Sequence, residues 1–316
     1  MSRFKKELLD KGKLFVPVIF SFGAVLEDIP LREYVGDATK ISNALRTIQG
    51  YFQVDGVTCY ADRTIMAEAL GCGLDWSECP PAIEPLPSAP TDVDTAVGNA
   101  LRDGRLGTAV EVTQRLNTLL SETILMCSIC GPLTLARQLL GSNPRQAFDR
   151  RDILNLSTKA ILAFSKALGD AGIDLLLLTE EELPALDEPL LKELRRCYSP
   201  IWNTAKFYDM FPLLTVRQFM IENVEPLGRI VDGVVLPVEY TLQDSLGATR
   251  RSFALPVAIL EKESDEIEAY LTKSSIGGNS KAASFFLLTT ENEIPKSINK
   301  EFMIRGIQTV KEFIKR

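Results

Sequence analysis

The sequence predicts an α/β protein built as a single (β/α)8 barrel of the TIM type. Two observations indicate this fold: the chain has 316 residues, and roughly eight short apolar runs recur along it, mostly separated by segments of helical periodicity. Short buried strands joined by crossover helices pair in parallel, and eight such units in a chain of this length are typical of a closed barrel. A doubly wound open sheet is the alternative. No shift in composition marks a boundary, so residues 1–316 are expected to form one domain.

The first third of the chain is expected to hold an N-terminal extension and two strand–helix units. Residues 15–22 are apolar and predict the first strand. Residues 37–52 predict a helix, because apolar side chains recur there at three- and four-residue spacing. Residues 54–60 predict the second strand. A Pro-rich loop should follow it, since prolines interrupt regular structure at positions 80, 81, 85, 87 and 90.

Helical and apolar segments continue to alternate in the rest of the chain. The helix expected at 155–171 is bounded by Asn155 or Ser157 as a cap and by Gly172 as a stop. The run at 173–178 is continuously apolar, as in a parallel strand covered on both faces. The other expected strands are 124–129, 211–216, 233–238, 253–260 and 285–288. The other expected helices are 107–120, 133–140, 189–197, 264–271 and 300–314.

Composition excludes several classes of protein. The chain carries 35 Lys and Arg against 42 Asp and Glu, a net charge of −7, which disfavours nucleic-acid binding. It has no histidine, which excludes a Ser-His-Asp triad and any His-ligated metal. Six cysteines are dispersed, the first residues lack a long apolar segment, and no apolar run could span a bilayer. We therefore expect a reduced, cytoplasmic protein outside the membrane.

Acidic side chains follow several of the expected strands. The active site of a barrel lies at the carboxyl ends of its strands, where these residues would gather. Crowded carboxylates can have raised pKa values and donate protons, although acidic residues after strands also cap the next helix. Residues 180–182 are expected in a solvated loop, with at most one or two facing the cavity. The candidate catalytic acids are Asp62, Glu180, Glu181 and Glu239, and Glu291 is a further acidic residue at the rim.

Four segments resemble the uroporphyrinogen decarboxylase superfamily. Val54 to Arg63, followed by Ala67-Glu68-Ala69-Leu70-Gly71-Cys72, is similar to its apolar strand ending in Asp and its "EALG" segment. Gly131 to Ala136 reads GPLTLA and resembles its turn into a helix. Ala171 to Asp174 and Glu291 to Pro295 resemble the entry to its fourth strand and its final strand. The resemblance spans almost the whole chain and implies a (β/α)8 barrel.

One chemistry that the resemblance implies is decarboxylation of uroporphyrinogen without a cofactor. Asp62 matches the aspartate that lies under the tetrapyrrole in that family. The Arg-rich segment expected after the first strand is absent, since residues 21–27 read SFGAVLE, and a highly carboxylated substrate needs several cations. The family's Tyr and Ser positions fall on Gln138 and Glu181. These departures make decarboxylation the alternative.

The other chemistry is corrinoid-dependent methyl transfer, and residues 67–72 are closer to this branch. Its thiol-methylating members hold zinc through His and Cys, but the matching strands, 214–218 and 288–291, contain neither. We therefore expect no zinc site of that type. The sequence favours a methyltransferase that moves a methyl group between a small donor, such as an aryl methyl ether or a methylamine, and a separate corrinoid protein. A barrel that binds a tetrapyrrole or corrinoid without catalysis is a third possibility.

The candidate binding residues lie near the carboxyl ends of expected strands or carry flat aromatic rings that could contact a ligand. The pair Cys127 and Cys130 is isolated, so we expect buried packing rather than a structural zinc site. Homodimerisation is implied only by the resemblance. The candidate substrate- or cofactor-binding residues are Phe22, Tyr60, Arg63, Cys130, Gln138, Arg217 and Glu291.

Overall fold

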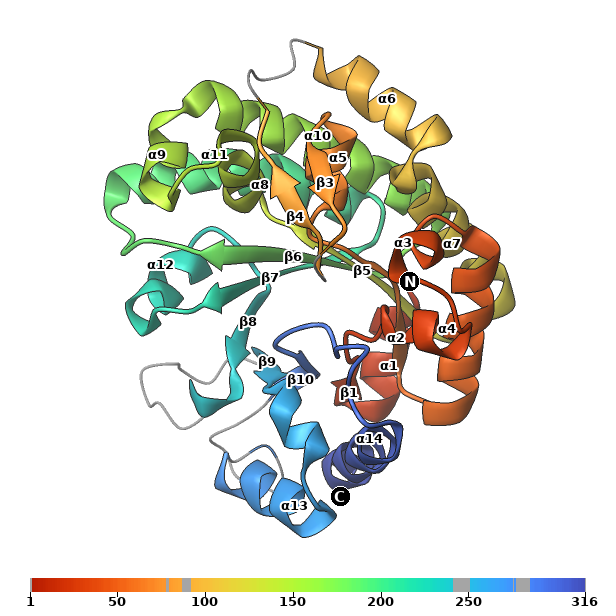
Figure 1. Ribbon diagram of the computed structural model, residues 1–316. Coiled ribbons are helices and arrows are strands. Elements are labelled where there is room, and N and C mark those ends of the chain that lie inside the picture. Colours follow the sequence, from red (N-terminus) through yellow and green to blue (C-terminus); the bar gives the residue numbers. More distant parts are fainter. Residues whose placement is uncertain are drawn as a thin grey trace.

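The chain folds around a sheet of eight strands, all parallel to their neighbours, in the order β1-β10-β9-β8-β7-β6-β5-β2 (Figure 1). The computed structural model describes residues 2–77, 80–86, 92–240, 251–274, 276 and 285–315. The strands are β1 (Leu14–Phe15), β2 (Gly56–Ala61), β5 (Ile124–Cys130), β6 (Leu175–Glu182), β7 (Phe211–Gln218), β8 (Val234–Pro237), β9 (Arg251–Leu255) and β10 (Phe285–Thr290).

The two ends of this sheet meet through the segment that follows β1. The backbone N–H of Asp55 donates to the carbonyl of Phe15 at 3.2 Å, and the Thr58 hydroxyl donates to the carbonyl of Pro17 at 3.1 Å. Residues 15–17 therefore run beside β2 and nearly close the sheet. The expected (β/α)8 barrel is confirmed.

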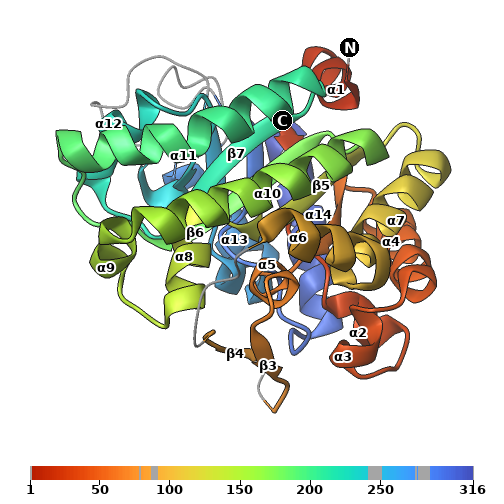
Figure 2. The same cartoon turned by 90° about the horizontal axis from the view of Figure 1, so that it is seen from above.

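Helices cover the outside of the barrel, and α10 and α11 lie side by side along one flank (Figure 2). Apolar residues on their inner faces, such as Ile161 and Phe164 of α10, are fully buried. The longer helices are α4 (Ala38–Phe52), α6 (Val93–Asp103), α7 (Arg105–Leu119), α8 (Pro132–Leu140), α10 (Arg151–Ala171), α11 (Glu188–Phe207), α13 (Ser264–Lys273) and α14 (Lys300–Lys315). The shorter ones are α2 (Phe22–Leu26), α3 (Leu31–Tyr34), α5 (Ile65–Ala69), α9 (Pro144–Asp149) and α12 (Val224–Gly228).

Local sequence signals explain where several helices begin and end. The Asp37 carboxylate accepts hydrogen bonds from the backbone of Thr39 and Lys40, which fixes the start of α4 where the sequence predicts it. Gly172 ends α10 in a left-handed conformation, φ 88°, as expected for a glycine stop. Asn155 and Ser157 are not caps, because α10 already begins at Arg151.

Three other expectations are corrected. The first strand is only Leu14–Phe15, and residues 16–20 are assigned to no strand, although Val16 and Pro17 still hydrogen-bond to the neighbouring strands. Residues 180–182 belong to β6, where Glu180 pairs with Val216 and Glu182 with Gln218, so they are not a loop. In the Pro-rich segment, β3 (Gly73–Asp75) and β4 (Ala82–Glu84) form an antiparallel hairpin, which projects from the barrel in Figure 2. Pro87 and Pro90 lie outside the described residues.

The N-terminal extension forms helix α1 (Arg3–Lys11), which covers the amino-terminal end of the barrel. Phe4 packs against Phe211 and Phe286, at the starts of β7 and β10, with ring centroids 5.0 and 6.1 Å away. Arg3 Nε lies 2.8 Å from Asp174 Oδ2, just before β6. The end of the barrel opposite the expected active site is thus closed.

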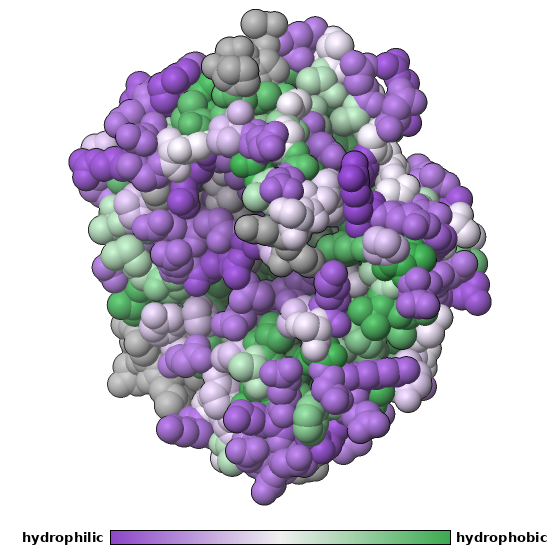
Figure 3. Space-filling view, viewed as in Figure 1, coloured by the Kyte–Doolittle hydropathy of each residue, from purple (hydrophilic) through white to green (hydrophobic). Residues whose placement is uncertain are grey.

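The outer surface carries polar side chains over most of the face seen in Figure 3, with apolar residues in separate patches between them. Among the described helices, none is long and apolar enough to cross a bilayer.

Candidate active site

A cavity of about 330 Å³ lies at the carboxyl ends of the strands, where the barrel fold places active sites. Its apolar lining includes Val18, Phe20, Trp76 and Leu177. Its charged lining residues, among those the structure describes, are Asp62, Arg63, Arg217, Glu291, Glu293 and Lys296.

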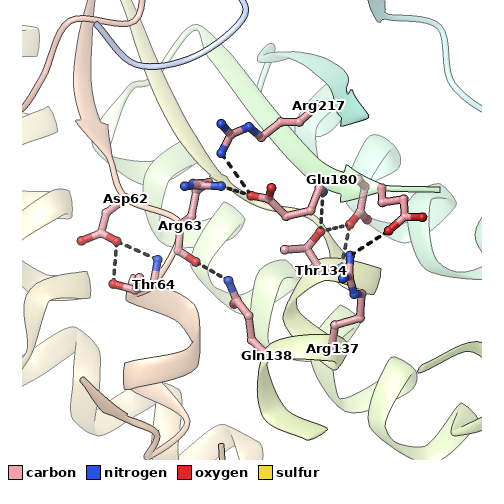
Figure 4. A network of polar contacts seen from close by, with 10 residues as sticks. Asp62, Arg63, Thr64, Thr134, Arg137, Gln138, Glu180 and Arg217 are labelled. Carbon is pink, nitrogen blue, oxygen red and sulfur yellow. Dashed lines mark hydrogen bonds and ion pairs between the residues drawn. The ribbon is translucent and has the colours of Figure 1, made fainter. Parts of the chain in front are cut away.

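Asp62 follows β2 directly and is held in one orientation. Its Oδ1 accepts hydrogen bonds from the backbone N–H and the hydroxyl of Thr64, both at 2.7 Å (Figure 4). Its Oδ2 forms an ion pair with Arg105, the first residue of α7. Burial alone would lower the pKa of Arg105, but the nearby charges of Asp62 and Glu68 raise it, so this buried guanidinium stays charged.

Arg63 and Arg217 both pair with the same carboxylate, that of Glu181. Arg63 comes from the end of β2 and forms a direct ion pair with Glu181 Oε1, while Arg217 Nη1 lies 3.6 Å from the same oxygen. The pKa of Arg63 is lowered, mainly by burial and to a smaller extent by repulsion from the positive charge of Arg217. Gln138 of α8 donates to the Arg63 carbonyl at 3.0 Å and so positions the arginine without lining the cavity.

Glu293 lies in the segment after β10 and lines the cavity. Its Oε1 accepts a hydrogen bond from the backbone N–H of Ser21, across 272 residues of sequence. Burial raises the pKa of Glu293 to about 7, and the nearby Asp62 charge adds to the effect while the hydrogen bonds from Ser21 oppose it. A carboxyl group in this state can donate a proton near neutral pH.

Glu180 is fully buried and does not line the cavity. Its carboxylate accepts hydrogen bonds from the backbone N–H groups of Leu133 and Thr134, at 3.1 and 2.7 Å, and from the hydroxyls of Thr134 and Tyr198, at 2.6 and 2.5 Å. It therefore caps the N-terminus of α8, as acidic residues after strands often do. Burial raises its pKa, and these hydrogen bonds oppose the shift.

The remaining predicted residues divide between the cavity and other positions. Glu291 lines the cavity. Phe22 and Cys130 are buried in the core, and the Tyr60 hydroxyl donates to the Val35 carbonyl at 2.6 Å. Glu239 is exposed and accepts a hydrogen bond from Tyr270 at 2.8 Å. The structure thus brings Asp62, Arg63, Glu181, Arg217 and Glu291 together.

Three charged residues of this site are not among the sequence candidates, namely Arg105, Glu293 and Lys296. Arg105 gave no signal, because its role depends on a partner 43 residues away. Glu293 stands in the segment that the resemblance singled out, but the sequence alone did not distinguish it from Glu291.

The cysteines are packing residues in the described part of the chain. Cys59, Cys127 and Cys130 are fully buried, and burial raises the pKa of each thiol. No group of three or more Cys, Asp or Glu side chains among the described residues could hold a metal ion. The donor set of a zinc site therefore does not assemble there.

Several solved structures share the fold of this chain. A methyltransferase from Methanosarcina mazei superposes with a TM-score of 0.76 over 99% of both chains, at 16% identity. A B12-independent methionine synthase from Shewanella sp. W3-18-1 gives 0.56 over 90% of this chain and 88% of that one, at 12% identity. A putative vitamin-B12 independent methionine synthase from Listeria monocytogenes gives 0.54 over 96% and 95%, at 13% identity. At these identities the likeness shows the fold alone.

Sequence comparison supplies the family. No curated protein matches the chain significantly. The family model described as uroporphyrinogen decarboxylase matches residues 15–195, which is more than half of the chain. This segment runs from β1 into α11 and includes Asp62, Arg63, Arg105 and Glu181. The chain therefore belongs to the uroporphyrinogen decarboxylase family.

Proposed function

We propose that this protein is a methyltransferase that moves a methyl group from a small donor to the corrinoid of a separate protein. The observation that carries the proposal is Glu293, a carboxylic acid with a pKa of about 7 on the wall of a small, partly apolar cavity. The likeness of the whole chain to a protein described as a methyltransferase supports it. Aryl methyl ethers and methylamines are the donor classes we propose.

The same cavity is a poor match for a highly carboxylated tetrapyrrole. Its volume of about 330 Å³ lies at the small end of the roughly 300–1,000 Å³ that holds a drug-sized molecule. Its described lining has three basic residues, Arg63, Arg217 and Lys296, against three acidic ones, Asp62, Glu291 and Glu293. Several carboxylates bound there would find too few free cations, because Glu181 already engages both arginines.

In the proposed reaction, Glu293 acts as the general acid. Breaking the bond between the methyl carbon and its oxygen or nitrogen leaves negative charge on the departing atom, and a positioned acid lowers that cost. Glu293 gives its proton to this atom and becomes a carboxylate, which solvent then protonates again. The other acids are less suited: Asp62 and Glu181 are ion-paired, Glu180 caps a helix, and Glu239 is exposed.

The corrinoid of the partner would supply the nucleophile that takes the methyl carbon. The cavity lies at the carboxyl ends of the strands, so a partner docked over that end of the barrel could reach a donor held inside. This chain's own part is to bind the donor, to keep water from it with apolar residues such as Phe20 and Trp76, and to provide the proton.

The experiment is anaerobic and uses the purified full chain. It is mixed with cob(I)alamin and a panel of aryl methyl ethers and methylamines, and the visible spectrum reports conversion to methylated cobalamin. Donor-dependent conversion is the expected result. A dedicated corrinoid protein replaces free cobalamin in a second arm, and uroporphyrinogen is the substrate in a third. Turnover of uroporphyrinogen with no methyl transfer in the first two arms would overturn the proposal.

A further inference from the structure

We propose that the arginine pair, Arg63 and Arg217, is a binding site for one carboxylate of a small substrate, so that the donor is an organic anion rather than a neutral molecule. This inference rests on the proposed function for the identity of the donor. The pair itself is described by geometry alone: two guanidinium groups from the ends of β2 and β7 meet at the cavity and share a single carboxylate, that of Glu181.

Both guanidinium groups keep unused hydrogen-bond donors. A guanidinium carries five N–H donors in a planar fork that matches a carboxylate. Within the described residues, the side chain of Arg63 donates only to Glu181, and that of Arg217 donates no hydrogen bond at all, since its closest approach to Glu181 is 3.6 Å. Their side chains are 33% and 30% exposed, so the free donors face the cavity.

Glu181 already shows that this place accommodates a carboxylate. Among the described residues, its side chain forms ion pairs with the two arginines alone, and its backbone N–H donates to the Thr134 hydroxyl at 2.8 Å. We therefore assign to Glu181 a positioning role: it keeps two like charges together while no substrate is bound. A substrate carboxylate would complete the pairing, because two cations and one anion leave one positive charge uncompensated.

Among the described residues, Glu181 is the only carboxylate that forms an ion pair with Arg63 or Arg217. Glu291 also acts on this pair from a greater distance: burial lowers the pKa of Arg217, and the charge of Glu291 opposes that shift. The charge of Asp62 is matched by Arg105 behind the wall, and Glu293 is half protonated near neutral pH. The site differs from that needed by a polycarboxylate, since it offers one place for one anionic group. A small methoxylated or methylated carboxylate would have its charged end here and its apolar body against residues such as Trp76 and Leu177.

The test measures binding by calorimetry, so that it does not depend on turnover. The probes are 4-methoxybenzoate and 4-methoxybenzamide, which share size and methoxy group but differ in charge. We expect the anion to bind more tightly than the amide. Arg217→Gln should weaken anion binding roughly 10- to 100-fold, as for the loss of a charge-assisted hydrogen bond, and leave the amide unchanged. Arg229→Gln, at the exposed residue that follows α12, is the matched control and should change neither.

Glu181→Gln gives the sharper result, because the two variants should act in opposite directions. Removing the competing carboxylate should tighten anion binding roughly 3- to 10-fold. A merely structural ion pair would give weaker binding in both variants. Equal affinity for anion and amide, no binding of either probe at millimolar concentration, or weaker anion binding in Glu181→Gln would each overturn the inference.

Methyl transfer from the same two probes separates this inference from the proposed function. Turnover of both probes with equal KM, unaffected by Arg217→Gln, would contradict the carboxylate site and leave the methyltransferase standing. Binding that depends on Arg217, with no methyl transfer from any donor, would contradict the proposed function and leave the carboxylate site standing.

Discussion

Arg105 forms an ion pair with Asp62 from the first turn of α7, and the same guanidinium donates to Glu68 at 2.5 Å. The Arg105 and Asp62 side chains are only 9% and 10% exposed. The carboxylate that the family resemblance places beneath a tetrapyrrole is therefore held and neutralised from behind. In this protein it shapes the cavity wall rather than presenting a free charge.

Replacing Arg105 should destabilise the fold strongly. Arg105→Gln leaves the Asp62 carboxylate buried without its cation, which typically costs about 3–5 kcal/mol. Urea unfolding followed by circular dichroism measures the loss. Arg115→Gln is the control on the same helix, since its pair with Glu111 is exposed and should contribute less than about 1 kcal/mol. Equal losses of unfolding free energy in the two variants would show that the buried ion pair stabilises the fold no more than the exposed one.

The cap on α8 gives a second prediction about stability. Tyr198→Phe removes a hydroxyl that donates to the buried carboxylate of Glu180, and hydrogen bonds to charged groups contribute about 1.5–3 kcal/mol. Tyr270→Phe removes a similar bond to the exposed Glu239 and should cost well under half as much. The same denaturation experiment compares the two. If Tyr198→Phe proves neutral, the hydrogen bond from Tyr198 does not stabilise the buried Glu180 carboxylate.

Glu293 should also make the stability of the fold depend on pH. Its pKa is about 7 in the folded chain against 4.5 as the ordinary value, so the fold favours the protonated form. The contribution is fully present below pH 4.5 and is lost as the pH rises through about 7. Between about pH 5 and about pH 8 the wild type should lose more stability than Glu293→Gln. If urea titrations show that the wild type and Glu293→Gln lose the same unfolding free energy between the two pH values, the raised pKa of Glu293 is contradicted.

Much of the fold could be predicted because its signals are local. The apolar runs at 54–60 and 124–129 became β2 and β5, and the Asp37 cap and the Gly172 stop lie where the sequence placed them. The extension of β6 through Glu180 to Glu182 was missed, because a polar run after a strand carries no local sign of whether pairing continues.

The site was less predictable, since its geometry depends on contacts distant in sequence. Arg105 meets Asp62, and Glu293 meets Ser21, only after the barrel has formed. The segment after β10 folds back on the segment after β1, where the Ile294 N–H donates to the Val18 carbonyl at 2.8 Å. Periodicity along the chain contains no information on such pairs. The family resemblance indicated the segment from Glu291 to Pro295, but it did not single out Glu293 within it.

We propose that Glu293 supplies the proton in methyl transfer, and the pH–rate profile of the enzyme tests this role most directly. The wild-type rate of donor-dependent cobalamin methylation should fall as the pH rises through about 7, because the acid form is lost. Glu293→Gln should be slower by roughly 10²- to 10⁴-fold at lower pH and show no such fall. Glu182→Gln, at the end of β6 and outside the described cavity lining, should keep the wild-type profile. A Glu293→Gln variant with the wild-type rate and the wild-type profile would contradict the claim.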